Sequence, residues 1–450
     1  MPIQKVNRRR FIRQIGMGTA LGPLWSHRSK SVILGANERL RIGVIGCGNM
    51  GSRHLDALLA MQKTANIQVT AVCDVYRKRL EAAAAKMGAR AYADYQDLLS
   101  QKELDYILIA TPEHWHHRMT LDALDAGKHV YVEKPLTQTI QQAKEVVHQV
   151  HRSRLKLQVG VQGMSDESYA VASRYIRDGT LGKVVMAQID YSRNYADDFW
   201  AYDIDPDANP QTNLNWSAWL GPAPKRDWDP RRYFQWRRYW DYSGGIATDL
   251  FIHRVTRIIK AVGLTFPKRV VASGGTWQFT ESVAQIPDTF NMLCDYPGGP
   301  TVVLLSSMAN DSPVAHVIRG NKATLRFTPE GFVITPQDLA LEDNRGSWLR
   351  RLPTTLGFVI TPQGLALEDT VQPGEFRAQD RWSKVYRKTG AEDITLHHQN
   401  LQSAIRRDTP LNCDVMLGYY GTVVTGMGVK SFRRRQYLKW NSEKESVEKA

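Results

Sequence analysis

Cysteine is scarce in this sequence, with 4 among 450 residues, and the spacing of the four does not match a zinc site. A disulfide scaffold is therefore excluded. Long apolar runs are also missing: none approaches the roughly 20 residues that a transmembrane helix requires, so we expect no membrane span. With 42% hydrophobic and 23% charged residues, the composition is that of a globular protein of one to three domains.

Acidic residues are missing from the first 37 positions, where seven lysines and arginines supply half of the formal net charge of +14. Another basic cluster lies near the C-terminus, at Lys430, Arg433, Arg434 and Arg435. A nucleic-acid site needs basic residues arranged along a groove or stripe. Because the basic excess belongs mostly to the two ends of the chain, we expect no nucleic-acid partner.

The basic N-terminus has the pattern of a targeting signal. Arg8, Arg9 and Arg10 precede a weakly apolar stretch at residues 15–24, which resembles a twin-arginine (Tat) export signal. A basic disordered N-terminus is the alternative. We set residues 1–36 apart as a leader and predict an exported, periplasmic protein. No small-x-small cleavage site follows, so the leader could remain as an anchor. Outside the cytoplasm a nicotinamide cofactor would have to stay bound and be regenerated on the protein.

A glycine motif opens the remaining sequence. The strand predicted at Leu40–Ile45 runs into Gly46-Cys47-Gly48-Asn49-Met50-Gly51, and a helical stretch follows. Such glycines permit a tight turn and the close approach of a pyrophosphate to a helix N-terminus. The next strand, Ile67–Cys73, ends at Asp74, which is placed to accept hydrogen bonds from an adenosine ribose or to cap the next helix. Its charge favours NAD over NADP, whereas Arg77 and Lys78 could reverse that preference.

Strand and helix patterns alternate through residues 76–161, with helices expected at 76–87, 116–126 and 138–151 and strands at 105–110, 129–132 and 155–161. This alternation predicts a doubly wound parallel sheet, a Rossmann NAD(P)-binding domain at residues 37–162. Ligands bind such sheets at the carboxyl ends of the strands. We therefore expect one crevice to gather the cofactor-binding residues Gly46, Gly48, Asn49, Met50, Gly51, Asp74, Thr111, Pro112, His114, His116, Glu133 and Lys134.

The pattern changes in the second half, residues 163–450. After a helix at 168–177, strands separated by turns are expected at 183–192, 269–272, 289–296, 301–308 and 324–328. This predicts an α+β domain with a mostly antiparallel open sheet. Open sheet faces favour association, so we expect a homo-oligomer. Cys47 and Cys73, in a predicted turn and a core strand, are expected to be buried thiols.

One helix of this half carries polar residues away from its apolar stripe. It is predicted from Asp249 to Val262, after Gly244-Gly245, with Phe251, Val255, Ile258, Ile259 and Val262 forming the stripe. Asp249 and His253, four residues apart, lie together on the opposite face. His253 therefore faces either solvent or a cleft, and on the spacing alone a solvated pair is the commoner outcome.

Aromatic residues crowd the stretch before this helix, where six of the 12 tryptophans fall between residues 200 and 240. Aromatic faces beside polar groups suit sugars and subunit contacts equally well. Tyr191, Trp236 and Trp240 are the candidate substrate contacts.

A different feature is a local duplication at residues 331–369, in which residues 331–337 recur at 357–363. We expect a peripheral strand–loop insertion outside the active site.

Together these motifs resemble the Gfo/Idh/MocA family of oxidoreductases, in particular its Tat-exported members. The resemblance covers nearly everything after the leader and rests on the glycine motif, Thr111-Pro112-Glu113-His114-Trp115-His116, Glu133-Lys134-Pro135, and Gly244-Gly245-x-x-x-Asp249-x-x-x-His253. The segment 216–222 and the region around 400–410 agree with it. After His253, Arg254, Val255 and Thr256 replace a more usual acidic stretch, which leaves the substrate open.

The resemblance implies a role for each of three residues. Lys134 would lie near the nicotinamide and lower the pKa of the reacting hydroxyl. His253 would remove the hydroxyl proton as hydride leaves the same carbon, which suits an imidazole with a pKa near neutrality. Asp249 would orient His253 or bind a neighbouring sugar hydroxyl. No metal is implied.

Three functions follow, and the sequence ranks them without deciding. The first is an NAD(P)-dependent oxidoreductase that moves hydride between a sugar or polyol carbinol and a tightly bound nicotinamide cofactor. The second is an NAD-dependent glycoside hydrolase that oxidises, eliminates, adds water and re-reduces. The third is a noncatalytic sugar-binding protein that retained the fold. A small-molecule carbohydrate or polyol is the expected partner in each.

Overall fold

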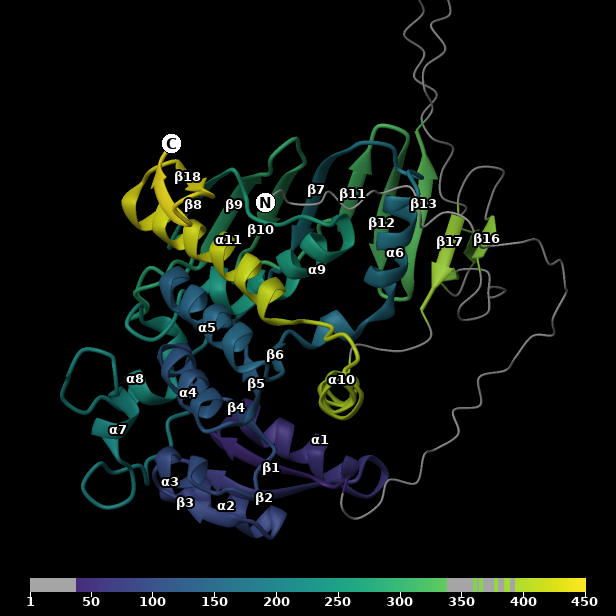
Figure 1. Cartoon of the computed structure of the whole chain (residues 1–450). Coiled ribbons are helices and arrows are strands. Elements are labelled where there is room, and N and C mark those ends of the chain that lie inside the picture. Colours follow the sequence, from purple (N-terminus) through teal and green to yellow (C-terminus); the bar gives the residue numbers. More distant parts are fainter. Residues whose placement is uncertain (1–37, 338–358, 362–363, 367–375, 379–383, 389–392) are drawn as a thin grey trace, which may run out of the picture. The chain divides into compact units, whose positions relative to one another are not determined.

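The computed structural model describes residues 38–337, 359–361, 364–366, 376–378, 384–388 and 393–450. The leader at 1–36 and most of the second copy of the duplication lie outside these residues. Helices and strands alternate through the first half, and strands predominate after residue 183 (Figure 1). No helix in the described ranges is long and apolar enough to cross a membrane.

The first half is built on a six-stranded parallel sheet with the order β3-β2-β1-β4-β5-β6. The chain moves outward from β1 to β3 and then crosses back to β4, so the order reverses between β1 and β4. Such a switch point leaves a crevice at the carboxyl ends of the strands. The strands are Leu40–Ile45 (β1), Ile67–Cys73 (β2), Arg90–Tyr92 (β3), Tyr106–Ile109 (β4), His129–Glu133 (β5) and Leu157–Gly160 (β6).

Helices cover both faces of this sheet. One apolar core joins α1, α2 and α10 to β1, and a second core joins α3, α4 and α5 to the other face. Helix α10 comes from the C-terminal part of the chain, so the first half is completed by a distant segment. The helices are Asn49–Ala65 (α1), Arg77–Met87 (α2), Tyr95–Leu99 (α3), Glu113–Asp125 (α4), Ile140–Ser153 (α5) and Ile394–Arg407 (α10).

The second half contains an eleven-stranded sheet in which β7 and β10 are the one parallel pair among the described strands. The predicted doubly wound sheet and the mostly antiparallel sheet are thus both confirmed. The strands are Val184–Asp190 (β7), Arg269–Gly275 (β8), Thr289–Asp295 (β9), Thr301–Leu305 (β10), Val317–Gly320 (β11), Ala323–Thr328 (β12), Gly331–Pro336 (β13), Phe376–Ala378 (β16), Lys384–Arg387 (β17), Leu438–Asn441 (β18) and Ser446–Lys449 (β19).

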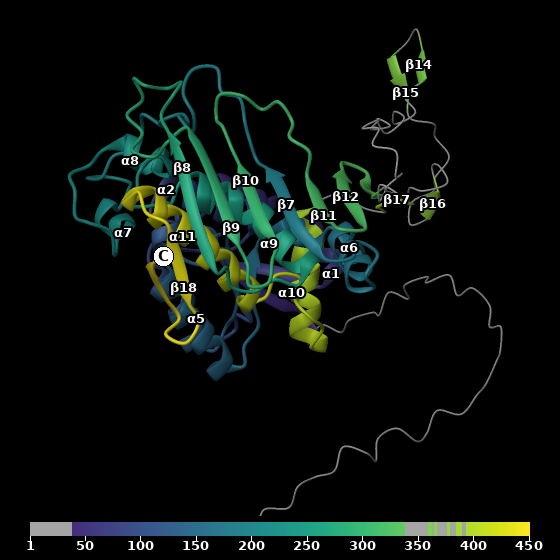
Figure 2. The same cartoon turned by 90° about the horizontal axis from the view of Figure 1, so that it is seen from above.

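Helices α6, α9 and α11 pack on one face of the eleven-stranded sheet (Figure 2). Helix α11 also contacts α5 and β6, so it joins the two halves. Its glycines allow this: a Cβ on Gly418 would lie 2.6 Å from Val159 Cγ2. These helices and the shorter ones of the second half are Glu167–Arg177 (α6), Trp216–Leu220 (α7), Pro230–Phe234 (α8), Ile252–Val262 (α9) and Val415–Arg434 (α11), with 3-10 turns at Gln162–Ser165 and Trp236–Arg238.

The first copy of the duplicated segment forms β13, an integral strand between β12 and β17. Phe332 and Ile334 are buried there, and the Phe332 ring stacks on Tyr386. The copy therefore contributes to the core of the sheet, because its alternating apolar residues match the pleat. Of the rest, Val359–Thr361 (β14) pairs with Gly364–Ala366 (β15).

All four cysteines are buried and free, as expected for Cys47 and Cys73. Burial raises the pKa of each thiol. They are therefore neutral core residues.

Candidate active site

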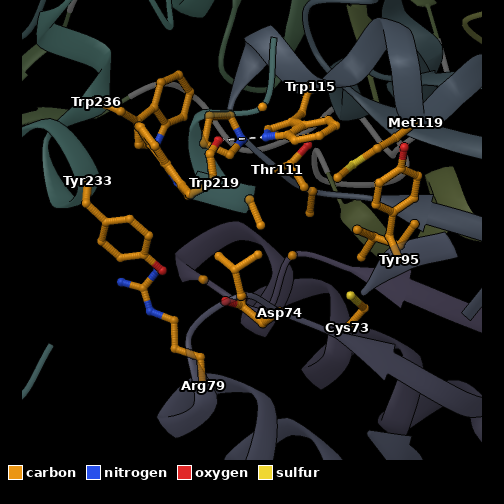
Figure 3. A pocket seen from close by; sticks show the side chains of 18 of the residues that line it. Cys73, Asp74, Arg79, Tyr95, Thr111, Trp115, Met119, Trp219, Tyr233 and Trp236 are labelled. Carbon is orange, nitrogen blue, oxygen red and sulfur yellow. Dashed lines mark hydrogen bonds between the residues drawn. The ribbon is translucent and has the colours of Figure 1, made fainter. Parts of the chain in front are cut away.

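A cavity of about 440 Å³ opens at the carboxyl ends of β1, β2, β4 and β5, where the strand order reverses. Its floor includes the glycine turn after β1 and the ends of the neighbouring strands. Its far wall comes from residues 200–242, which we call the strap. Figure 3 shows strap residues Tyr233 and Trp236 on one side of the cavity and Cys73 and Tyr95 on the other.

The glycine turn has the shape that a pyrophosphate requires. Gly46 has φ +91°, and a Cβ at Gly51 would lie 1.9 Å from the carbonyl oxygen of Gly46, so neither position accepts a side chain. Helix α1 begins at Asn49 with no side-chain cap and no acid in its first turn. Its first N–H groups are thus available to an anion at the positive end of the helix.

Asp74 fixes the turn and lines the cavity. Its carboxylate accepts hydrogen bonds from the backbone N–H of Cys47 and of Tyr76, each at 2.8 Å. Burial raises its pKa, against the opposing charge of Arg79. Lys78, which could have favoured NADP, instead pairs with Asp205 and Asp207 of the strap. Asp74 therefore keeps its place at the nucleotide end of the cavity.

Arg79 is a cavity residue that the sequence reasoning missed. Its guanidinium donates to the Tyr233 hydroxyl at 3.3 Å (Figure 3). The same guanidinium lies over the rings of Tyr233 and Phe234. A planar cation held between aromatic rings at the ribose end suits an adenine or a phosphate. Its one sequence signal was a third basic residue in the first turn of α2, where acids are preferred.

The strap is attached to the first half by backbone hydrogen bonds. The N–H of Asn215 donates to Val75, and the N–H of Arg77 donates to Asn213, at 2.9 and 2.8 Å. Trp115 Nε1 donates to the carbonyl oxygen of Trp219 at 2.7 Å (Figure 3). The aromatic residues of the strap pack on one another and on Tyr76, so most of them form the core of a cover.

The opposite end of the cavity holds a buried ionic cluster. Lys134, directly after β5, donates from Nζ to Asp249 Oδ1 at 2.6 Å and to the Asp249 carbonyl oxygen at 3.0 Å. Arg237 Nε donates to the same Oδ1 at 2.9 Å. Burial alone would raise the pKa of Asp249, but the charges of Lys134 and Arg237 outweigh it and lower that pKa strongly. Asp249 lies in a π-helical turn, Ala247–Phe251, that continues into α9.

Glu133 forms a second polar chain behind Lys134. Its Oε1 lies 2.9 Å from His54 Nε2 and accepts from Gln162 at 2.6 Å, and His54 Nδ1 lies 2.9 Å from His398 Nε2. Burial opposes ionisation of Glu133, but contact with His54 and the charge of Lys134 outweigh it and lower its pKa. The position of Lys134 is thereby tied to α1 and α10.

His253 lies in the first turn of α9, one helical turn beyond Asp249. Its ring meets the Tyr191 ring edge-on, with 6.0 Å between centroids. Burial and the nearby charge of Lys134 keep the pKa of His253 well below its usual value. The imidazole is therefore neutral at physiological pH, and burial makes it a weaker proton acceptor than the near-neutral histidine expected from the sequence.

Two family models match this chain. An oxidoreductase family with an NAD-binding Rossmann fold matches residues 40–161, and the C-terminal alpha/beta domain of the same family matches residues 168–324. The chain belongs to the Gfo/Idh/MocA oxidoreductase family. Residues 40–161 are accordingly an NAD-binding Rossmann domain, and the glycine turn, the uncapped α1 and Asp74 fit that cofactor.

Relatives agree with this family. An inositol 2-dehydrogenase/D-chiro-inositol 3-dehydrogenase of Lactiplantibacillus plantarum is 30% identical over 163 residues, 35% of this chain and 46% of that protein. An inositol 2-dehydrogenase of Pseudarthrobacter chlorophenolicus is 35% identical over 151 residues, 33% of this chain and 44% of that protein. The chain thus matches less than half the length of these relatives.

Solved structures share the fold. A levoglucosan dehydrogenase in complex with NADH has a TM-score of 0.63 at 16% identity, covering 89% of this chain and 99% of that one. The WlbA dehydrogenase of Bordetella pertussis, in complex with NADH and UDP-GlcNAcA, has a TM-score of 0.62 at 18% identity, covering 90% and 99%.

The predicted site residues of this Gfo/Idh/MocA chain divide into two groups. Ten line the cavity: Gly46, Gly48, Asn49, Met50, Asp74, Thr111, Pro112, Glu133, Lys134 and Trp236. Outside its lining lie Gly51, His114, His116, Asp249, His253, Tyr191 and Trp240. Of these, Asp249 contacts Lys134 directly, and Tyr191 contacts His253.

His114, His116 and Trp240 have structural contacts. His114 Nε2 lies 3.0 Å from the Trp219 carbonyl oxygen, and burial lowers its pKa to about 4. His116 lies between the carbonyl oxygens of Thr111 and Pro135, which joins the turns after β4 and β5. Trp240 packs on Phe432, away from the cavity. These three residues therefore make structural contacts around the crevice and do not line the cavity itself.

Glu113, like Arg237, is a further residue of the site that sequence reasoning passed over. It lies in the first turn of α4 and accepts hydrogen bonds from the Ser243 hydroxyl, the Thr248 hydroxyl and the Gly244 N–H, at 2.7, 3.0 and 3.1 Å. Burial raises its pKa to about 7. It fixes the turn that precedes Asp249.

No group of three or more histidine, cysteine or acidic side chains in the described ranges could hold a metal ion.

Proposed function

We propose that this chain is an NAD-dependent dehydrogenase of a sugar or polyol carbinol. The observation that supports this most is the buried Lys134–Asp249 pair beside the NAD-binding cavity, with the neutral His253 one turn further along. NAD, when bound, supplies the hydride acceptor. The substrate hydroxyl loses its proton to His253, and the Lys134 ammonium stabilises the alkoxide that develops.

Asp249 acts through Lys134 in this scheme. Its carboxylate accepts a hydrogen bond from Lys134 Nζ and so positions the ammonium, and Arg237 Nε donates to the same Oδ1. This differs from the expected role of orienting His253 or binding a sugar hydroxyl, because Asp249 Oδ1 accepts hydrogen bonds from both cations. A fixed ammonium stabilises the transition state more than a mobile one does, since it needs no reorganisation when negative charge develops on the substrate oxygen.

We further propose that the cofactor stays bound through the cycle and is exported with the folded protein. The strap supports this: its backbone pairs with the loop after β2, and its aromatic core covers the nucleotide end of the cavity. A cover of this kind slows release because several contacts must open together. The leader at 1–36 is the reason to place the protein in the periplasm.

An enclosed cofactor also suits the glycosidase hypothesis, since that cycle returns the hydride and needs no external acceptor. Both are tested by incubating the purified full chain, loaded with NAD, with free sugars, polyols and nitrophenyl glycosides. Stoichiometric reduction of bound cofactor by a free sugar or polyol is the expected result. Glycoside cleavage without net reduction would favour the hydrolase. If neither the free sugars and polyols nor the glycosides are converted, a noncatalytic binding protein is favoured.

We also propose that two copies associate through the open face of the eleven-stranded sheet. Leu293 is 46% exposed there, and the half-buried Val303 lies beside it on the same face. Light scattering of the wild type and of Leu293→Asp checks this. An oligomer that the variant dissociates is expected, and a monomeric wild type would contradict it.

A further inference from the structure

Three cations, Lys134, Arg237 and Arg193, lie at the substrate end of the site. Lys134 and Arg237 share the single carboxylate of Asp249, and Arg193 lies over the Tyr191 ring, which in turn meets the ring of His253. Glu133, directly before Lys134, pairs with His54, and Glu113 is held by the neutral hydroxyls of Ser243 and Thr248. Among the described residues, Arg193 is thus the one of the three cations that shares no carboxylate.

Arg193 is the cation without a partner of opposite charge. It lies three residues after β7, and its backbone N–H donates to the Ser307 carbonyl oxygen at 2.8 Å, which fixes the position of the residue. Its Nη1 reaches the Tyr195 hydroxyl at 3.5 Å, and its guanidinium lies over the Tyr191 ring. No carboxylate of the described residues lies within 4.0 Å of it.

This arrangement costs free energy unless an anion completes it. Arg193 is half-buried, and Arg237 is mostly buried between the rings of Trp236 and Tyr202. Partly desolvated guanidinium groups normally pair with a carboxylate or phosphate. Tyr191 contacts both the Arg193 guanidinium and the His253 ring, so the uncompensated charge lies one side chain away from the proposed base.

We propose that the substrate is a sugar acid, a uronate or aldonate, whose carboxylate pairs with Arg193 while a carbinol of its ring or chain lies between Lys134 and His253. This rests on the proposed dehydrogenase function. A carboxylate matches the planar fork of one guanidinium and neutralises its single charge. Arg237 is already engaged by Asp249, which leaves Arg193 for a singly charged carboxylate.

The test compares sugars that differ in one group. Reduction of NAD bound to the full chain is measured with glucose against glucuronate and with galactose against galacturonate. We expect a kcat/KM at least about 30-fold higher for the acids, the gain of a hydrogen-bonded charge pair. Arg193→Gln should lower the acid-to-neutral ratio at least tenfold, mainly through KM, and Arg193→Lys should restore part of it. Arg319→Gln, which removes an exposed charge on β11, is the matched control and should leave the ratio unchanged.

The outcomes separate this inference from the function on which it rests. If neutral sugars reduce the cofactor as well as the acids do, or if sugar phosphates exceed both, the sugar-acid assignment is wrong and the dehydrogenase stands. If no sugar of any class reduces the cofactor, the dehydrogenase is wrong. Calorimetry of glucuronate binding to the wild type and to Arg193→Gln then decides the inference. Binding by the wild type that is lost in the variant supports it, whereas no binding or equal binding by the two proteins overturns it. Melting temperatures of each variant confirm that it folds.

Discussion

The two sheets supply the site in different ways. The six-stranded sheet delivers its residues directly from strand ends: Gly46 follows β1, Asp74 follows β2, and Lys134 follows β5. The eleven-stranded sheet contributes Asp249, His253 and Arg237 through the long connection between β7 and β8, which includes the strap. The first kind of placement follows from topology and is local, whereas the second depends on packing between segments far apart in the chain.

The contact of Lys134 with Asp249 joins these two contributions, so its loss is expected to have the largest effect. Lys134→Met removes the ammonium that we propose to stabilise the alkoxide, and it leaves Asp249 with Arg237 alone. We expect turnover to fall by about 10³-fold. Single-turnover reduction of bound NAD measures this, and binding of NAD should persist.

Lys63→Met, in the exposed last turn of α1, is the control for that variant and should leave turnover unchanged. Turnover of Lys134→Met within tenfold of the wild type would show that the two halves do not meet in a working site.

The strands of the six-stranded sheet could be predicted from the sequence because their apolar runs and flanking turns are short-range signals. Strands β1 and β2 coincide with the predicted limits, and β4, β5 and β6 agree within about two residues. In contrast, the sequence did not predict α11, because four glycines lower its helix propensity. Nor could it place Arg79 or Arg237 in the cavity, since the strap that holds them is ordered by partners more than 100 residues away.

Glu113 is a second link between the halves, and it predicts a dependence on pH. Its pKa rises from 4.5 to about 7 in the folded protein, so the folded state holds more protons than the unfolded state between these values. Its contribution to the free energy of unfolding therefore falls as pH rises through this window. Glu113→Gln should gain about 3 kcal/mol relative to wild type between about pH 4 and about pH 8.

Urea unfolding of wild type and Glu113→Gln across this range measures the difference. Glu81→Gln, an exposed change on α2, should show no such trend. A difference that is constant with pH would mean that Glu113 is ionised throughout and contributes only as an acceptor for Ser243 and Thr248.

Gly418 sets local propensity against long-range packing. Propensity alone predicts that Gly418→Ala stabilises α11 by about 1 kcal/mol. The structure predicts the opposite sign, a loss of about 1–3 kcal/mol, because the new methyl would lie 2.6 Å from Val159 Cγ2 on a stiff, β-branched side chain. In a Val159→Ala background that methyl group is absent, and Gly418→Ala should then be stabilising. Melting temperatures of the four proteins decide this, and a gain in the wild-type background would refute the packing argument.

The smallest effect is expected at the exposed edge of the strap. Lys78 pairs with Asp205 at 2.8 Å and Asp207 at 2.7 Å, but its side chain is 54% exposed, so water and salt screen these contacts. Lys78→Ala should speed NAD release by less than about fivefold, and only at low ionic strength. Arg77→Ala, one residue away and paired within α2, is the control. If Lys78→Ala instead freed the cofactor, the strap would be held by surface charge, and its aromatic core and backbone pairing with the loop after β2 would be secondary.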